Sequence, residues 1–169
     1  MALTYEAIAT VTVGSGGAAD IQFTSIPQTY TDLLLSLSLR DADTGGNWSE
    51  ASIKPNGATS NRSQRSVYGT GSAAGSDSGS NIYAWISNAN NTASTFGNAT
   101  VYIANYTSAN AKSMSIDSVT ENNATGALAV LNAALWNDSA AITSITITPE
   151  VANFAQYSTA TLYGIKNTV

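Results

Sequence analysis

The stretch that decides the fold is FTSIPQTYTDLLLSLSLR, residues 23–40. Its second half alternates leucine with serine: one face carries Leu33, Leu35, Leu37 and Leu39, and the other carries Ser36, Ser38 and Arg40. A period of two over this length predicts a half-buried strand and not a helix. Pro27 cannot donate a hydrogen bond to a β-ladder, so the chain must turn or cross there. The stretch therefore predicts a strand, a proline corner and a second strand.

The same alternation recurs along the chain. Residues 5–13, a glycine-rich turn at 14–18 and a strand pattern from residue 19 predict a hairpin. Further strand patterns lie at 81–87, 99–106, 112–119, 142–148 and 158–165, whereas 126–136 fits either a helix or a twisted strand. About eight or nine strands with no convincing long helix predict an all-β single domain over residues 1–169, a sandwich or a barrel. We expect the first and last strands to lie inside the sheets.

Residues 41–80 break this pattern, because they are polar and contain little apolar sequence. They predict a long polar loop, and loops of this length in a compact domain are usually functional or make contacts. With the core strands placed outside this segment, a version trimmed to a short turn should still fold.

The composition excludes several classes of function. Only 10% of residues are charged, against roughly 25% in an average soluble protein, which favours a surface partly covered by a partner. The net charge is −5, and Arg62 with Arg65 is the nearest approach to a basic patch, so nucleic acid is not expected as a partner. No apolar run has transmembrane length, and a membrane is not expected either. The chain has no cysteine and no histidine, which excludes Ser-His-Asp and Cys-His catalysis and His/Cys zinc sites.

The remaining motifs do not predict an enzyme. GSDSG at 75–79 has Asp77 where a nucleophile elbow needs serine, and its glycines predict a flexible loop. DADTGGNWSE at 41–50 resembles a calcium loop, but Gly45 and Ser52 occupy positions that need ligands. The eleven acidic residues show no spacing typical of a glycosidase pair. We therefore expect no catalytic residue, no metal and no cofactor.

Four aromatic residues lie in or beside the polar segment: Trp48, Tyr68, Tyr83 and Trp85. Exposed aromatic rings can stack on sugars, but tryptophan and tyrosine are also enriched at protein interfaces. We predict that these four are partly buried anchors or contacts with a neighbouring subunit, and we keep sugar binding as the alternative.

Two segments together resemble small structural proteins of tailed bacteriophages, many of them from marine and cyanobacterial phages. Near the front, that group has a Ser-Ile-Pro-x-Thr-Tyr-x-Asp/His-Leu signature followed by an alternating strand that ends in arginine. The matching positions here are Ser25, Ile26, Pro27, Thr29, Tyr30, Asp32, Leu33 and Arg40. The closing pattern matches at Ile142–Ile145, Phe154, Ser158 and Leu162–Ile165, and Gln156 and Tyr157 depart from it where glycine is common.

The resemblance covers about a quarter of the chain and implies a jelly-roll-like antiparallel β-sandwich that assembles around a symmetry axis, with no catalytic residues. The corner formed by Pro27, Thr29, Tyr30 and Asp32 is expected to be structural. Hydrogen bonds from these short polar side chains should lock it locally, and the tyrosine ring should close one end of the core.

Three functions are weighed. The first is a capsid decoration (cement) protein, made in the host cytoplasm and located on the outer surface of the virion head, which binds the major capsid protein and itself as a homo-oligomer, a trimer. The second is a tail-fibre or receptor-binding tip module that recognises host surface glycan. The third is a secreted lectin-like or enzyme domain, against which the missing signal peptide and catalytic groups count. The first is the function we expect.

Overall fold

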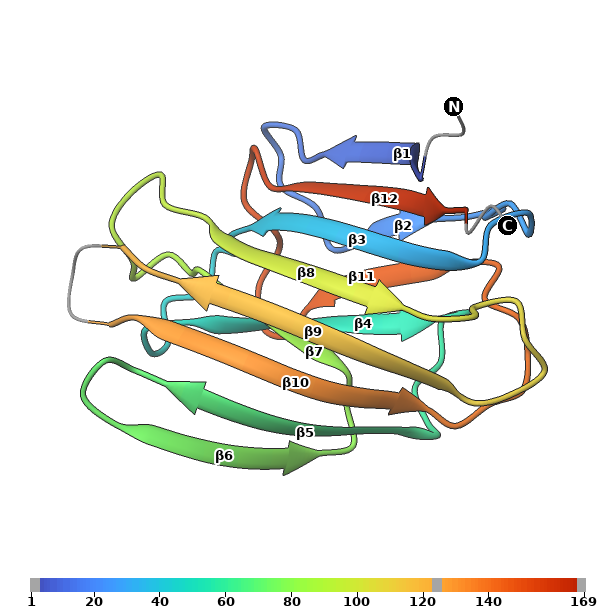
Figure 1. The fold of residues 1–169 in the computed structure, drawn as a ribbon. Helices are drawn as coiled ribbons and strands as arrows, with labels where there is room; N and C mark the ends of the chain where they lie inside the picture. The colour runs from blue at the N-terminus through green and yellow to red at the C-terminus, as the bar shows by residue number, and fades with distance from the viewer. Residues whose placement is uncertain (1–3, 123–125, 167–169) are drawn as a thin grey trace.

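The fold consists of two antiparallel β-sheets packed face to face (Figure 1). The computed structural model describes residues 4–122 and 126–166, and these residues form twelve strands and no helix. The all-β sandwich is therefore confirmed, while its jelly-roll connectivity stays a prediction. No helix that could cross a membrane occurs within the described part of the chain.

The larger sheet has eight strands. Their order is β1 (Tyr5–Thr12), β12 (Thr159–Ile165), β3 (Asp32–Leu39), β8 (Gly97–Ile103), β9 (Lys112–Thr120), β10 (Leu128–Trp136), β5 (Arg62–Gly69) and β6 (Ala74–Gly79). The smaller sheet has four strands in the order β2 (Ile21–Phe23), β11 (Ile145–Pro149), β4 (Ser49–Pro55) and β7 (Tyr83–Ile86). The strands β8, β9 and β10 form a meander, and β5 and β6 extend it to one edge of the larger sheet (Figure 1).

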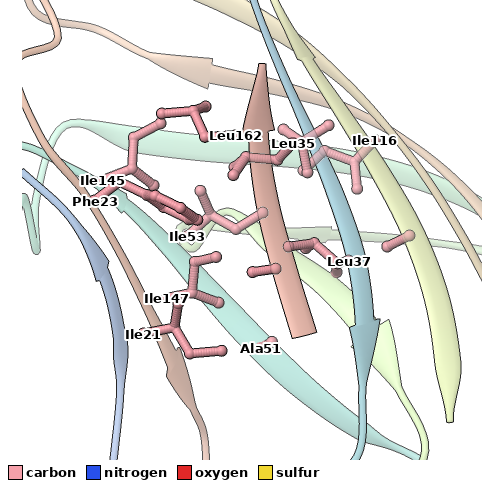
Figure 2. Packing of buried hydrophobic residues seen from close by; sticks show 14 of the residues in the cluster. Ile21, Phe23, Leu35, Leu37, Ala51, Ile53, Ile116, Ile145, Ile147 and Leu162 are labelled. Atoms are coloured by element: carbon pink, nitrogen blue, oxygen red, sulfur yellow. The ribbon is translucent and has the colours of Figure 1, made fainter. Parts of the chain in front are cut away.

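The alternation in β3 has the predicted register. Its four odd-numbered leucines are buried, Leu34 is only half-buried, and Ser36 and Ser38 are exposed. In Figure 2, Leu35, Leu37 and Leu162 of the larger sheet lie opposite Ile53, Ile145 and Ile147 of the smaller sheet. Burying one such side chain contributes about 1.5–3 kcal/mol to the stability of the fold. Packing in this aliphatic layer therefore holds the two sheets together.

The predicted hairpin at the N-terminus is wrong. β1 pairs with β12 in the larger sheet, whereas β2 pairs with β11 in the smaller sheet. A glycine-rich turn indicates that the chain changes direction, but it does not indicate which sheet the next strand joins. Gly17 has a left-handed φ of 71°, and a Cβ there would lie 2.8 Å from the carbonyl oxygen of Phe154, so this crossing requires glycine.

The expectation that the first strand lies inside a sheet is also wrong, because β1 is an edge strand. Its pairing with β12 is irregular between Ala7 and Ala9, so the strand does not keep one face toward the core. As a result Tyr5 is exposed, and Ile8 packs against the core. The last strand, β12, lies between β1 and β3 as expected.

The segment 41–80 is not a loop, since it contains β4, β5 and β6. β4 lies between β11 and β7, and β5 lies between β10 and β6. Trimming this segment would therefore remove strands from both sheets, contrary to our expectation. GSDSG is likewise not a flexible loop, because it lies in β6, where Asp77 pairs with Ser66. The physical reason is that the buried face of β5 is polar, with Arg62, Gln64 and Ser66, so hydrophobic periodicity does not reveal it.

Candidate functional site: an aromatic pocket at the open edge of the sandwich

The candidate site lies beside β7, the edge strand of the smaller sheet, which packs against β9 and β8 of the larger sheet (Figure 1). Side chains of β5 and β6 also reach β7. β7 pairs with β4 on one side only. Its other side meets side chains of the larger sheet. Gln64 accepts a hydrogen bond from the backbone N–H of Tyr83 at 3.1 Å, and Asn132 donates to the carbonyl of Tyr83 at 2.9 Å. Ser118 accepts from the N–H of Trp85 at 3.3 Å.

These three hydrogen bonds fix the two aromatic residues of β7. The polar residues responsible were not recognised from the sequence. One feature of the sequence could have revealed them. Each is a polar residue at an inward position of its strand, where an apolar residue is usual: Gln64 on β5, Ser118 on β9 and Asn132 on β10. An unpaired backbone group in this place would cost about 1–3 kcal/mol, which gives a buried amide or hydroxyl here a clear physical role.

The structure brings all four predicted aromatic residues together. The rings of Trp48 and Trp85 lie 6.3 Å apart at an interplanar angle of 86°, and those of Tyr83 and Trp85 lie 5.4 Å apart at 89°. Tyr83 is buried, whereas the other three are partly exposed. The indole N–H of Trp85 is buried and finds no acceptor among the described residues.

Beside these rings is a hollow of about 170 Å³, lined by Trp48, Tyr68, Asp77, Trp85 and Leu128. Tyr68 reaches it from the inner face of β5 because its ring passes over Gly75 of β6. A Cβ at Gly75 would lie 2.6 Å from the Tyr68 hydroxyl, so a larger residue would displace the ring. We call this hollow and its five lining residues the aromatic pocket.

One acidic side chain, Asp77, lines the aromatic pocket, and two more lie near Tyr83. The hydroxyl of Tyr83 donates to Asp77 Oδ2 at 3.2 Å. Burial, followed by the charges of Glu50 and Asp77, raises the pKa of Tyr83 far above its usual value. Burial and the adjoining carboxylate of Glu150 raise the pKa of Glu50 to about 8. The carboxyl groups of Glu50 and Glu150 therefore lie close enough to influence one another, and Glu50 keeps its proton at neutral pH because of this raised pKa.

Glu50 and Glu150 belong to a second, polar hollow of about 260 Å³ that Tyr83 also lines. The N–H of Glu150 donates to the carbonyl of Glu50 at 3.0 Å, which holds the two residues together although they are far apart in sequence. Arg62 lines the same hollow and donates to Ser52, Asn81 and the carbonyl of Thr59. Two adjoining carboxyl groups of this kind can share a proton. The sequence shows no such pair, because it depends on the course of β4 and β11.

The two arginines weighed as a basic patch do not form one. Arg62 is buried between the sheets, whereas Arg65 points to the exposed face and donates to the carbonyl of Gln64.

The acidic residues of the calcium-like motif do not act as one group. Ser49 donates to Asp41 at 3.1 Å and to Asp43 at 3.4 Å, whereas Glu50 lines the polar hollow. Burial raises the pKa of Asp41 to about 6. In the described ranges, no three or more carboxylate, histidine or cysteine side chains gather where they could hold a metal ion.

The proline corner makes structural contacts. Asp32 is buried and accepts hydrogen bonds from Tyr102 at 2.7 Å and from the N–H of Asn105 at 2.8 Å. These partners are distant in sequence. The hydrogen bonds of Asp32 therefore stabilise the corner through long-range contacts, whereas local ones were expected. The carbonyl of Pro27 accepts from the hydroxyl of Tyr106. Thr29 is exposed.

The two segments that carry the phage resemblance meet in space. Tyr30 covers Gly164, where a Cβ would lie 2.3 Å from the ring, and Lys166 Nζ lies 5.2 Å from the ring centre. Ser158 accepts from the N–H of Arg40 at 3.1 Å and donates to its carbonyl at 2.9 Å. Residues that match the phage pattern thus join β3 and the proline corner to the ends of β12.

Scans against protein-family models, against curated proteins and against solved structures each found no match for this chain.

Proposed function

We propose that this chain is a structural protein of a tailed-bacteriophage virion, which binds the outside of the head as a decoration protein and stabilises the shell. The phage resemblance of residues 23–40 and 141–165 supports the class of protein. Its partners in this proposal are the major capsid protein and further copies of itself, as a trimer. Binding to the assembled shell would stabilise that state by mass action.

One observation carries the proposal: the outer face of the larger sheet exposes large apolar side chains on four adjacent strands. They are Val67 on β5 (59% exposed), Leu131 on β10 (57%), Val119 on β9 (41%) and Tyr102 on β8 (37%). Val67 pairs directly with Leu131, and Ala129 of β10 pairs with Val119. We call these four side chains the apolar face.

Scattered exposed apolar residues are ordinary, but a set gathered on adjacent strands indicates an interaction surface. The exposed Asp117, which pairs with Leu131, adds one carboxylate to this surface. Leu131 takes part in three shallow hollows on this face, so the surface is uneven enough to receive side chains of a partner. The low charge of the whole chain makes this set harder to keep solvated. Covering it in an assembly would remove apolar area from water at about 25 cal/mol per Å².

The experiment is decoration of heads that lack the protein. We expect the purified chain to sediment with the heads and to raise their resistance to heat, and labelled copies on complete virions should lie over the head. Leu131→Asp should abolish both effects, because it removes the central apolar side chain and places a second carboxylate beside Asp117. Ser36→Asp adds the same charge to an exposed position of β3 and should leave them intact. Label found only at the tail, or equal decoration by both variants, would contradict the proposal.

The second candidate function is a tail-fibre or receptor-binding module that recognises host surface glycan. The aromatic pocket favours it, because rings of Trp48, Tyr68 and Trp85 border an accessible hollow. This function predicts that label lies at the tail and that the chain binds isolated host glycan but not heads.

A further inference from the structure

We propose that the aromatic pocket is a cage for a methylated ammonium group, such as the trimethylammonium of choline or of trimethyllysine. This inference goes beyond the virion role and does not depend on where the chain is located. It rests on the shape of the pocket, on the charges around it and on the small number of polar groups that line it.

The shape suits a round group. Trp48 and Trp85 stand nearly perpendicular, at 86°, and Tyr68 adds a third ring to the lining. A flat sugar stacks best on one broad ring surface, whereas a tetrahedral cation gains from rings that meet at an angle, since several of its methyl groups then touch aromatic walls. A hollow of about 170 Å³ is of the size of a single small head group.

The charges favour a cation. Asp77 lines the pocket itself, whereas Glu50 and Glu150 line the polar hollow. The raised pKa of Glu50, about 8, keeps that side chain protonated at neutral pH, so Asp77 supplies the negative charge that favours a cation. The cationic side chains Arg62 and Lys54 line the polar hollow and not the aromatic pocket. Arg62 is also engaged with Ser52, Thr59 and Asn81. A cation in the pocket therefore meets ring faces and a carboxylate, whereas an anion would meet repulsion.

Besides the carboxylate of Asp77, the lining side chains offer a saccharide only the hydroxyl of Tyr68 and the indole N–H groups, of which that of Trp85 is buried. Among the five lining residues, Asp77 is the one charged side chain, and its Oδ2 already accepts from Tyr83. A pyranose carries several hydroxyl groups that lose water on binding, and sites for such ligands place several polar groups around them. Hydroxyls left without partners reduce affinity strongly. A quaternary ammonium carries no hydrogen-bond donor, so this pocket satisfies it without further polar groups.

The experiment is a titration of the intact chain followed by tryptophan fluorescence and by NMR of the indole N–H signals. Four probes are compared: choline, trimethyllysine, 3,3-dimethylbutan-1-ol and methyl glucoside. The alcohol has the shape of choline but no charge, so it separates cation recognition from apolar filling. We expect choline or trimethyllysine to bind with a Kd of about 1–10 mM. The tighter of the two identifies the source as a choline head group or a methylated side chain. The alcohol should bind at least about tenfold more weakly, because it gains nothing from the ring quadrupoles.

Two pairs of variants complete the test. Asp77→Asn keeps an acceptor for Tyr83 but removes the charge, and should weaken cation binding by about three- to tenfold. Asp117→Asn makes the same change of net charge on the exposed side of β9 and should have no effect. Trp48→Phe should retain most of the affinity, whereas Trp48→Leu should lose it, since leucine preserves bulk but not the quadrupole. Thermal unfolding of each variant shows that it is folded.

Three outcomes would overturn the proposal. The first is equal binding of the neutral alcohol and choline. The second is binding of methyl glucoside without binding of either cation, which would assign the pocket to a sugar. The third is no spectral change with any cationic probe in the folded wild-type chain.

Discussion

The two ends of the sandwich are held together by different chemistry. At one end, β3 and β12 face β2, β11 and β4 through leucine, isoleucine and phenylalanine, as Figure 2 shows. At the other end, β5, β9 and β10 face β7 through side chains that include Gln64, Ser118 and Asn132. We refer to these as the aliphatic end and the polar end. Both are well buried, but only the first gains its stability mainly from removing apolar area from water.

This difference has an energetic consequence. Several buried polar atoms have no hydrogen-bond partner within the described residues, and four of them belong to the polar end: Arg62 Nε, Gln64 Nε2, Asn132 Oδ1 and Trp85 Nε1. Each such group carries a desolvation cost of about 1–3 kcal/mol. We therefore expect the polar end to be the less stable part of the sandwich, and it is also where the aromatic pocket lies. Binding sites are commonly drawn from the less stable regions of a fold.

The largest effect should come from a charge placed in the aliphatic end. Leu35 is fully buried, so Leu35→Asp buries a carboxylate without a partner and costs several kcal/mol of a total that is typically about 5–15 kcal/mol. We expect this variant not to fold, as judged by circular dichroism and by recovery of soluble protein. Leu34→Asp should be much milder, because Leu34 is half-buried on the opposite face of β3. Equal behaviour of the two variants would show that the register of β3 is wrong.

A smaller effect is expected from removing one hydrogen bond of the polar end. Ser118→Ala leaves the N–H of Trp85 without its acceptor and should lower the free energy of unfolding by about 1–3 kcal/mol. Because the bond positions β7, the near-ultraviolet signal of the tryptophans should also change. The measurement is denaturant unfolding, with the exposed Ser115→Ala on β9 as control, which should stay within about 0.5 kcal/mol of the wild type. If both variants are equally stable, the polar end does not depend on this bond.

The same difference explains what the sequence could predict. β3 was recognised because its buried face consists of leucine, which makes the period of two visible. β5 has the same period, but its buried face consists of Arg62, Gln64 and Ser66, so a search for apolar alternation misses it. The burial of these polar side chains depends on acceptors and donors from other strands, which no local pattern contains.

The candidate site was predictable to a similar extent. The four aromatic residues were identified from their types and from their place beside a polar segment, and the structure brings them together. The acidic partners were not identified. Glu50 and Glu150 meet only because β4 pairs with β11, and Asp77 faces Tyr83 only because β5 and β6 form a hairpin. Local sequence patterns do not show which distant strands pair, and these acidic contacts depend on that pairing.

The smallest expected effect concerns the pH dependence of the polar end. The pKa of Glu50 rises from its usual 4.5 to about 8 because the side chain is partly buried and adjoins Glu150. Between these two values the folded chain retains a proton that the unfolded chain has released, so this group's contribution to stability is complete below about pH 4.5 and is lost as the pH rises toward 8. Glu50→Gln cannot ionise, and its amide can still donate to Glu150. We therefore expect Glu50→Gln and the wild type to have similar Tm values at pH 4, and the variant to be the more stable at pH 9. Asp117→Asn controls for the change in net charge, since it removes a carboxylate from the exposed face of β9. A gain in Tm that is equal at pH 4 and pH 9, or that Asp117→Asn reproduces, would show that Glu50 does not retain its proton and that the polar end carries no such titrating pair.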